Sequence, residues 1–107
     1  MFQKVASLKE LKEKKMMRVE VGENAILVTL KDNKVFAISD KCPHMGASLA
    51  KGSLSDGVVT CAKHHAQIDV TNGQLVNSPK ILFLKVPAKN AKTYATKVEK
   101  DDILVEV

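Results

Sequence analysis

Two short segments of this chain each carry one cysteine and one histidine. Cys42 and His44 are one residue apart, and after a spacer of sixteen residues Cys61 and His64 follow with two residues between them. A fold that brings the segments together offers two thiolates and two imidazoles, which are typical metal ligands. A zinc finger usually takes its cysteines from one segment and its histidines from the other. Here each segment supplies one of each, so if the cysteines bind one metal ion and the histidines another, the natural occupant is a two-iron, two-sulfide ([2Fe-2S]) cluster. Zinc held by the same four residues, in an interaction module, is the open alternative.

The order and spacing of these ligands resemble the Rieske family, whose pattern is C-x-H, about sixteen residues, and C-x-x-H. Further agreement extends over nearly the whole chain and lies at Gly46, Leu49, Gly52, residues 69–73, Pro79 and the strand-like residues 35–40. Three positions of the second segment depart from the family pattern. Ala62 stands where proline is common, His65 where glycine is usual and Ile68 where an aromatic residue is common.

The resemblance implies that Cys42, His44, Cys61 and His64 bind one [2Fe-2S] cluster per chain. It also implies that a third loop, at Pro79, covers this cluster. His65 leaves one alternative open, since it is either a ligand in a segment shifted by one residue or a neighbour at the exposed tip. We expect the second, with His64 as the ligand.

By the same resemblance the chain looks like a soluble Rieske-type ferredoxin, similar to the ferredoxin component of aromatic-ring dioxygenase systems. Such a protein carries single electrons from a flavin-dependent reductase to a terminal oxygenase or another redox enzyme and catalyses no bond chemistry. No nucleophile with an adjacent base, phosphate-binding loop or open metal site is evident in the sequence. A second possibility is a small cluster-bearing subunit of a nitrite reductase-like enzyme.

Ligation by two thiolates and two neutral imidazoles leaves the oxidised cluster with no net formal charge, whereas four thiolates leave it negative. The mixed ligation therefore raises the midpoint potential into a range of about −150 to +300 mV. Hydrogen bonds to the sulfur atoms raise it further. High-potential relatives carry serine and tyrosine where this chain has Ala66 and Ile68. Because neither side chain can donate a hydrogen bond, we predict a potential in the lower part of the range.

The chain has 107 residues, of which 45% are apolar and 27% charged, as in an ordinary globular domain. This length suits a single Rieske-type domain over residues 1–107, with cluster-binding loops at about residues 40–80, and leaves no room for a catalytic domain. There is no apolar run typical of a signal peptide or membrane helix. Both cysteines serve as ligands, so none remains for a disulfide, and we expect a cytoplasmic protein.

The net charge of +5 raises the question of an anionic partner. The lysines near the N-terminus alternate with glutamates, and the chain has one tyrosine and no tryptophan, so no basic stripe with stacking aromatic residues is present. We therefore expect no nucleic-acid binding. A basic surface could instead steer docking to an acidic redox partner.

Short alternating segments with turn signals between them predict an all-β fold, a small antiparallel sandwich or barrel with a cluster-binding subdomain of hairpin loops at one end. We expect strands at residues 2–6, 16–21, 25–30, 35–39, 58–60, 67–70, 81–86, 94–98 and 103–107. Ser7 is a candidate N-cap for one or two helical turns through Leu8 and Leu11. Asn72-Gly73 is a strong hairpin signal.

Overall fold

The computed structural model describes residues 1–41, 48–62, 65–77, 80–81, 84–85 and 90–107. Its elements are β1 (Phe2–Ser7), α1 (Leu8–Lys14), β2 (Met16–Val21), β3 (Asn24–Lys31), β4 (Lys34–Ser39), the 3-10 turn Leu49–Lys51, β5 (Ser53–Ser55), β6 (Val58–Thr60), β7 (Gln67–Asp69), β8 (Leu75–Asn77), β9 (Lys80–Ile81), β10 (Leu84–Lys85), β11 (Thr93–Tyr94), β12 (Thr96–Glu99) and β13 (Asp102–Glu106).

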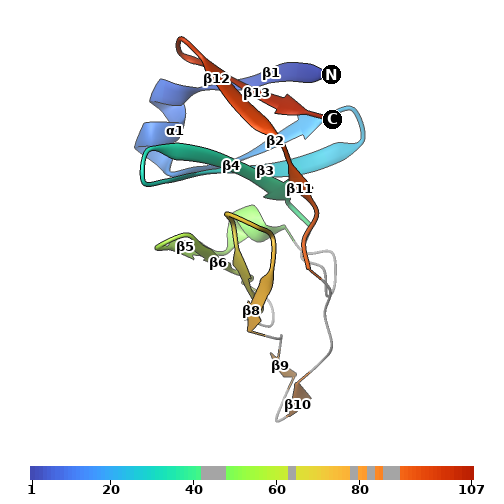
Figure 1. Cartoon of the computed structure of the whole chain (residues 1–107). Coiled ribbons are helices and arrows are strands. Elements are labelled where there is room, and N and C mark those ends of the chain that lie inside the picture. The colour runs from blue at the N-terminus through green and yellow to red at the C-terminus, as the bar shows by residue number, and fades with distance from the viewer. Residues whose placement is uncertain (42–47, 63–64, 78–79, 82–83, 86–89) are drawn as a thin grey trace.

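The strands form three sheets that lie one above another (Figure 1). The upper sheet has the order β1-β13-β12, the middle sheet β11-β4-β3-β2, and the lower sheet β5-β6-β7-β8. A separate two-stranded hairpin, β9 with β10, lies beyond the lower sheet. All these pairings are antiparallel. The upper and middle sheets form the part of the molecule that supports the lower sheet. The lower sheet belongs to the region of the predicted cluster.

The middle sheet is buried on both faces, which explains why β3 reads as a continuous apolar run and does not alternate. Ile26 and Val28 of β3 pack in one core with Leu11 of α1 and with Ile103 and Val105 of β13. The intervening residues of the middle sheet point the other way. There Leu27 and Ile38 form a second core with buried residues of the lower part, namely Leu49, Val59, Cys61, Ala66, Ile68, Val70 and Ala91. The lower sheet therefore rests on a rigid sheet that is itself anchored from above.

Helix α1 closes one end of the upper core. The Ser7 side chain caps it by accepting a hydrogen bond from the Glu10 backbone N–H at 3.1 Å. Leu11 is fully buried beneath it. The predicted N-cap and the short helix are both confirmed.

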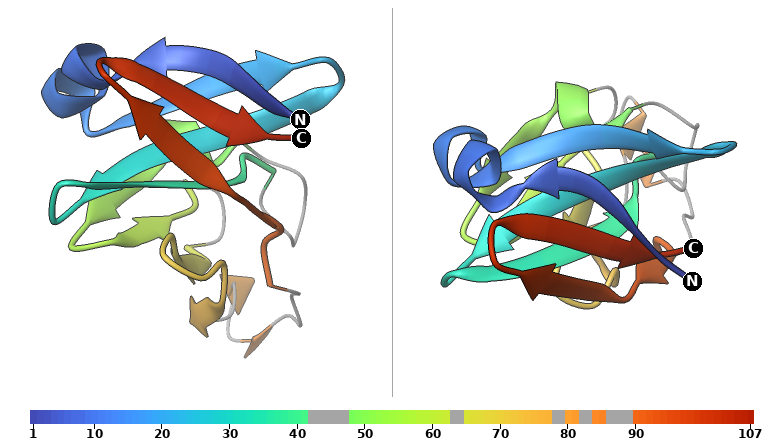
Figure 2. Two further views of the ribbon diagram at one scale, coloured as in Figure 1. Left: turned by 45° about the horizontal axis from the view of Figure 1, so that its top comes forward. Right: turned by 90° about the horizontal axis from the view of Figure 1, so that it is seen from above.

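The two ends of the described chain lie side by side. Strands β1 and β13 are neighbours, and the N–H of Val107 donates to the carbonyl oxygen of Met1 at 3.3 Å. In the view from above, the two termini meet at one corner of the upper sheet (Figure 2).

The predicted all-β antiparallel fold is confirmed, and the strands of residues 2–39 agree with prediction to within a residue or so. The predicted single strand over residues 81–86 is wrong. Instead β9 and β10 pair with each other, with Leu84 opposite Ile81, so the chain reverses within this segment. The predicted single strand over residues 94–98 is likewise two strands, β11 and β12, which belong to different sheets. The turn Leu49–Lys51, β5 and β8 were not expected from the sequence.

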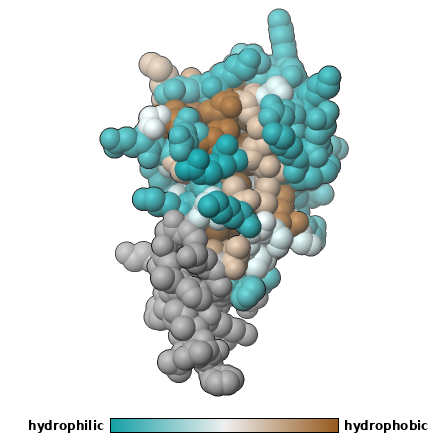
Figure 3. Space-filling model, turned by 180° about the vertical axis from the view of Figure 1, so that it is seen from behind, coloured by the Kyte–Doolittle hydropathy of each residue, from teal (hydrophilic) through white to brown (hydrophobic). Residues whose placement is uncertain are grey.

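Hydrophilic side chains cover much of the face opposite to that of Figure 1, around a strip of apolar surface (Figure 3). Few large apolar side chains of the described residues are strongly exposed, and these are Met1, Val76, Val98 and Val107. Within the part of the chain that the structure describes, no helix has the length and apolar character needed to cross a membrane.

Candidate metal centre

The first ligand segment, residues 41–48, which we call the first arm, is closed where it begins and ends. Strand β4 ends at Ser39, and Lys41 pairs with Ser48 in an isolated antiparallel bridge. The backbone N–H of Lys41 also approaches the Ser39 hydroxyl at 3.3 Å. The arm therefore begins directly at the end of a middle-sheet strand, as predicted for a loop carried on a rigid base.

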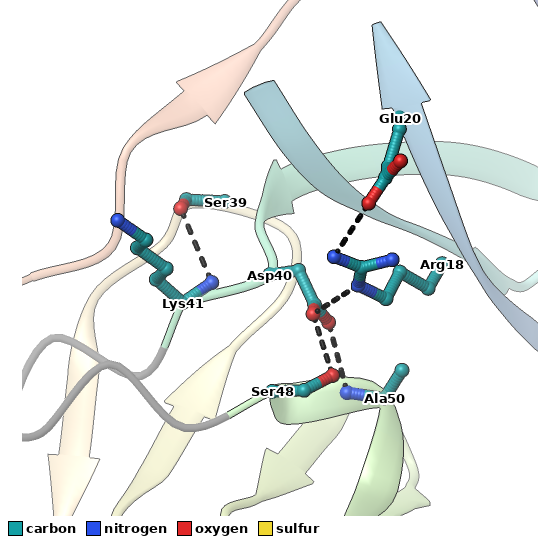
Figure 4. A network of polar contacts seen from close by, with 7 residues as sticks. All are labelled: Arg18, Glu20, Ser39, Asp40, Lys41, Ser48 and Ala50. Carbon is teal, nitrogen blue, oxygen red and sulfur yellow. Dashed lines mark hydrogen bonds and ion pairs between the residues drawn. The ribbon is translucent and has the colours of Figure 1, made fainter. Parts of the chain in front are cut away.

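Asp40 lies at this base, and Figure 4 shows the polar contacts around it. Its carboxylate accepts hydrogen bonds from the Ser48 hydroxyl at 2.6 Å, the Ala50 N–H at 2.9 Å and Arg18 Nε at 3.1 Å. Arg18 also pairs with Glu20 at 2.9 Å. The hydrogen bond to Glu20 raises the pKa of Arg18 above its ordinary value, and the contacts with Asp40 add to this, so the guanidinium is charged.

The second ligand segment, residues 61–66, forms the tip of the β6–β7 hairpin, and we call it the second arm. Thr60 pairs with Gln67 at the ends of the two strands. Within the tip, the N–H of Cys61 donates to the Ala66 carbonyl at 2.8 Å, and the N–H of His65 donates to the Cys61 carbonyl at 3.2 Å. The Gln67 side chain adds a hydrogen bond to the Thr60 hydroxyl at 3.2 Å. The backbone on both sides of Cys61 is thus fixed.

The segments that flank the two arms are packed together at Gly52, which follows the 3-10 turn after the first arm. A Cβ atom built on Gly52 would overlap the carbonyl oxygen of Thr60, directly before Cys61. Leu49 and Cys61 also belong to the same buried core. The backbones on either side of the two arms therefore approach as closely as the absence of a side chain allows.

Of the four predicted ligands, Cys61 lies in the described part of the chain, while Cys42, His44 and His64 lie outside it, as do Gly46 and Pro79. For the same reason the described residues contain no group of three side chains able to hold a metal ion. The predicted ligand set stays a prediction. His65 is exposed at the tip and has a φ of 62°, in keeping with its expected place beside the ligand.

The described part of the site fits an iron–sulfur cluster. Cys61 is a free cysteine with 2% of its surface exposed, held at a hairpin tip. Next to it, the buried Ala66 and Ile68 place no hydrogen-bond donor in their side chains, as the sequence implied. A buried, unpaired thiol between two fixed backbone segments is suited to serve as one thiolate ligand.

Two features of the site were missed from sequence. Asp40 and Arg18 are 22 residues apart, and neither has a spacing that marks it as part of the site. The available signal was an acidic residue directly between an apolar strand and the first cysteine.

Comparison with known proteins supports the same assignment. The model of the Rieske [2Fe-2S] domain matches residues 1–88. The ferredoxin component of biphenyl 2,3-dioxygenase from Rhodococcus jostii is 34% identical, over 97% of this chain and 91% of that protein. Human apoptosis-inducing factor 3 is 33% identical over 94% of this chain, but the chain spans 16% of its length.

Among solved structures, a complex of reduced oxygenase and oxidised ferredoxin in carbazole 1,9a-dioxygenase contains a chain that matches with a TM-score of 0.81 and 26% identity. The match covers 97% of this chain and 91% of that one. The predicted [2Fe-2S] cofactor is confirmed at the level of the family. Together with the buried thiol at the hairpin tip, the match over residues 1–88 shows that this chain belongs to the Rieske [2Fe-2S] domain family.

Proposed function

We propose that the chain is a one-electron carrier whose [2Fe-2S] cluster is bound by Cys42 and His44 of the first arm and by Cys61 and His64 of the second. The observation that carries this proposal is the buried, free Cys61 at a fixed hairpin tip, with the base of the first arm packed against the same hairpin. Each arm carries one thiol and one imidazole, which is the donor set of a Rieske cluster.

When bound, the cluster supplies reversible one-electron transfer at a potential set by its mixed ligation. The chain's own residues hold the ligands and exclude water from the thiolate side. Cys61 and Ala66 are buried in the lower core, and the middle sheet covers that core from above. The second arm lies at the end of the β6–β7 hairpin, where a redox partner can approach the site.

The proposed partners are a flavin-dependent reductase as donor and a terminal oxygenase as acceptor. Support comes from the matched structure, which is named as a complex of an oxygenase with its ferredoxin, and from the relative named as a ferredoxin component of a dioxygenase. A cytoplasmic location is part of the proposal, because cysteines used as metal ligands suit a reducing compartment.

Metal and acid-labile sulfide analysis of anaerobically purified protein, with EPR of the dithionite-reduced sample, tests the cofactor. We expect two irons and two sulfides per chain, as the family implies, and the low average g value of mixed cysteine and histidine ligation. Stoichiometric zinc, or no metal after expression with ample iron, would contradict the proposal.

Two neighbouring histidines give a matched test of the ligand set. We expect His64→Ala to abolish cluster binding, because one iron loses a ligand, and His65→Ala to leave the iron content unchanged. The opposite result would assign the ligand to His65 and shift the second arm by one residue.

The electron path is tested by mixing the purified protein with a flavin-dependent reductase and the oxygenase of a ring-hydroxylating system. We expect the reductase to reduce the cluster with NAD(P)H, and the oxygenase to reoxidise it. Because Lys41 and Lys51 are exposed beside the first arm, Lys51→Glu should slow reduction or reoxidation at low salt more than Lys12→Glu in α1. Equal effects of the two variants on these rates would show that the redox partners do not dock on the surface around Lys51.

A further inference from the structure

Asp40 is the only buried side chain with a formal charge among the residues that the structure describes. It is 2% exposed and stands at the end of β4, directly before the first arm. Burying a carboxylate is costly unless hydrogen bonds and an opposite charge offset it, and an apolar side chain of similar size is often at least as favourable for stability. The charge at this position therefore calls for a role beyond the stability of the sheet.

Asp40 binds the other end of the first arm through three contacts (Figure 4). Its carboxylate accepts hydrogen bonds from the Ser48 hydroxyl at 2.6 Å and the Ala50 N–H at 2.9 Å. Its main-chain carbonyl accepts another from the N–H of Leu49 at 2.7 Å. Since all three donors lie in residues 48–50, one side chain and one carbonyl close the loop at its base.

Two more contacts fix Asp40 to the middle sheet. Its N–H donates to the carbonyl of Ala25 in β3 at 2.9 Å. Its carboxylate accepts a hydrogen bond from Arg18 Nε of β2 at 3.1 Å, and Arg18 is held in turn by Glu20. Asp40 therefore attaches the ends of the first arm to strands β2 and β3, whose side chains pack in the two cores.

We propose that Asp40 is a positioning residue for the cluster, which holds the first arm so that Cys42 and His44 meet the ligands of the second arm. This inference rests on the proposed function. Asp40 acts through the loop and not as a ligand. Residues that orient metal ligands in this way govern how tightly the metal is retained.

A carboxylate fits this place better than its amide. One oxygen, Oδ2, accepts from both Ser48 and Arg18, while Oδ1 accepts from Ala50. Arg18 Nε and the Ala50 N–H are donors only, and an asparagine would have to turn its NH2 group towards one of them, although the Ser48 hydroxyl could still accept from it. Asp40→Asn therefore keeps the size of the side chain but loses the negative charge and at least one of the hydrogen bonds that hold residues 48–50 and Arg18.

The test compares iron release from anaerobically purified holoprotein to a strong iron chelator, together with EPR of the reduced cluster and far-UV circular dichroism. We expect Asp40→Asn to release iron about tenfold faster. The EPR lines should broaden, because the ligands of the first arm adopt a wider range of geometries, while the circular dichroism stays that of the wild type. Ser48→Ala should show a smaller acceleration, and Ser48→Thr, which keeps the hydroxyl, should return the rate to that of the wild type.

Glu20→Gln is the matched control, since it removes a charge on the outer side of Arg18 and leaves Asp40 and its three loop contacts in place. Its iron release should equal that of the wild type. If Asp40→Asn does not fold, the iron-release rates of Ser48→Ala and Ser48→Thr test the inference without it. Wild-type rates and EPR spectra in both Asp40→Asn and Ser48→Ala would overturn the inference while the proposed function stands. A wild-type protein without a [2Fe-2S] cluster would overturn both.

Discussion

Gly52 shows how a single residue constrains the site. Its φ of −89° is open to any amino acid, so its conformation does not require glycine. The requirement comes from space, because the Thr60 carbonyl lies where a Cβ atom would be. The close approach of the segments that flank the two arms depends on this one missing side chain.

We predict that Gly52→Ala lowers the free energy of unfolding by about 1–3 kcal/mol, the usual cost of an overpacked site, and reduces the iron content per chain. Gly22→Ala is the matched control. Gly22 has a φ of 61° but no atom within 4 Å of a built Cβ, so its cost of about 1–2 kcal/mol is conformational and should leave the iron content intact. Urea unfolding and iron analysis of both variants measure this, and equal iron loss would disprove a specific role of the contact.

Ala66 is the residue next to the cluster site whose chemistry bears most directly on the potential. It is fully buried in the same core as Cys61. The predicted potential in the lower part of the Rieske range rests on the inability of Ala66 and Ile68 to donate a hydrogen bond, and it stays a prediction. A hydroxyl at this position could supply the missing bond.

Ala66→Ser should therefore raise the midpoint potential by about 40–60 mV. This shift corresponds to a hydrogen bond that is roughly 1 kcal/mol stronger in the reduced state than in the oxidised state. Ala37→Ser, buried in the upper core on the other face of the middle sheet, should leave the potential unchanged. Redox titration followed by EPR is the measurement. A lower potential in Ala66→Ser would refute the explanation by hydrogen bonding.

At the scale of elements, α1 is the best example of a structure specified locally. Ser7 caps it, Glu10 lies in its first turn and Lys12 and Lys14 lie in its last, so both its ends match the helix dipole. Leu11 then ties it to the upper core. The helix lies beside the upper and middle sheets, far from the β9–β10 hairpin (Figure 1).

Replacing the cap by Ser7→Ala should lower the free energy of unfolding by about 1 kcal/mol, because the Glu10 N–H loses its partner. The iron content and the EPR spectrum should not change, since α1 packs on the upper core only. Ser55→Ala in β5, at an exposed site, is the control and should be neutral. A change in the EPR spectrum of Ser7→Ala would mean that the upper core transmits strain to the cluster.

How far sequence predicts an element depends on how local its causes are. The strands of residues 2–39 have five or more alternating or apolar residues and clear turns between them, and these were predicted. Strand β5 has three residues, two of them serines, and it exists because β6 lies beside it. Residues 81–86 contain no glycine, asparagine or proline to mark the reversal between β9 and β10, so an apolar run was taken for one strand.

The site was predictable to a similar extent. The ligand spacing identified the family, and the position of Cys61 at a hairpin tip was expected from the strands around it. The contacts of Asp40 join residues from β2, β3 and the turn after the first arm, which only the assembled fold brings together. The ligand roles of Cys42, His44 and His64 and the single-domain assignment over residues 1–107 stay predictions.

At the scale of the whole molecule, the two hydrophobic cores stabilise different parts of the protein. The upper core involves α1, the upper sheet and one face of the middle sheet, and none of the described residues in it belongs to either arm. The lower core includes Cys61 and Ala66 of the second arm itself. Loss of the cluster should therefore affect the two parts unequally.

After iron is removed with a chelator, we predict that hydrogen exchange at the Cys61 and Leu49 amides rises at least about tenfold, because the arms open locally. The amides of β3 that pair with β2 should keep their protection, since the upper core is untouched. NMR or mass spectrometry can measure both in one sample. A uniform loss of protection would show instead that the fold is one cooperative unit.

The pairing of β1 with β13 places both ends of the described chain at one corner, on the opposite side of the molecule from the β9–β10 hairpin. Because the first and last described residues are adjacent, a short linker could join them. A domain with adjacent termini can be inserted into a larger protein at one position without disturbing the arms. This geometry makes the module portable, in keeping with its match to about a sixth of human apoptosis-inducing factor 3 and to nearly the full length of a bacterial ferredoxin.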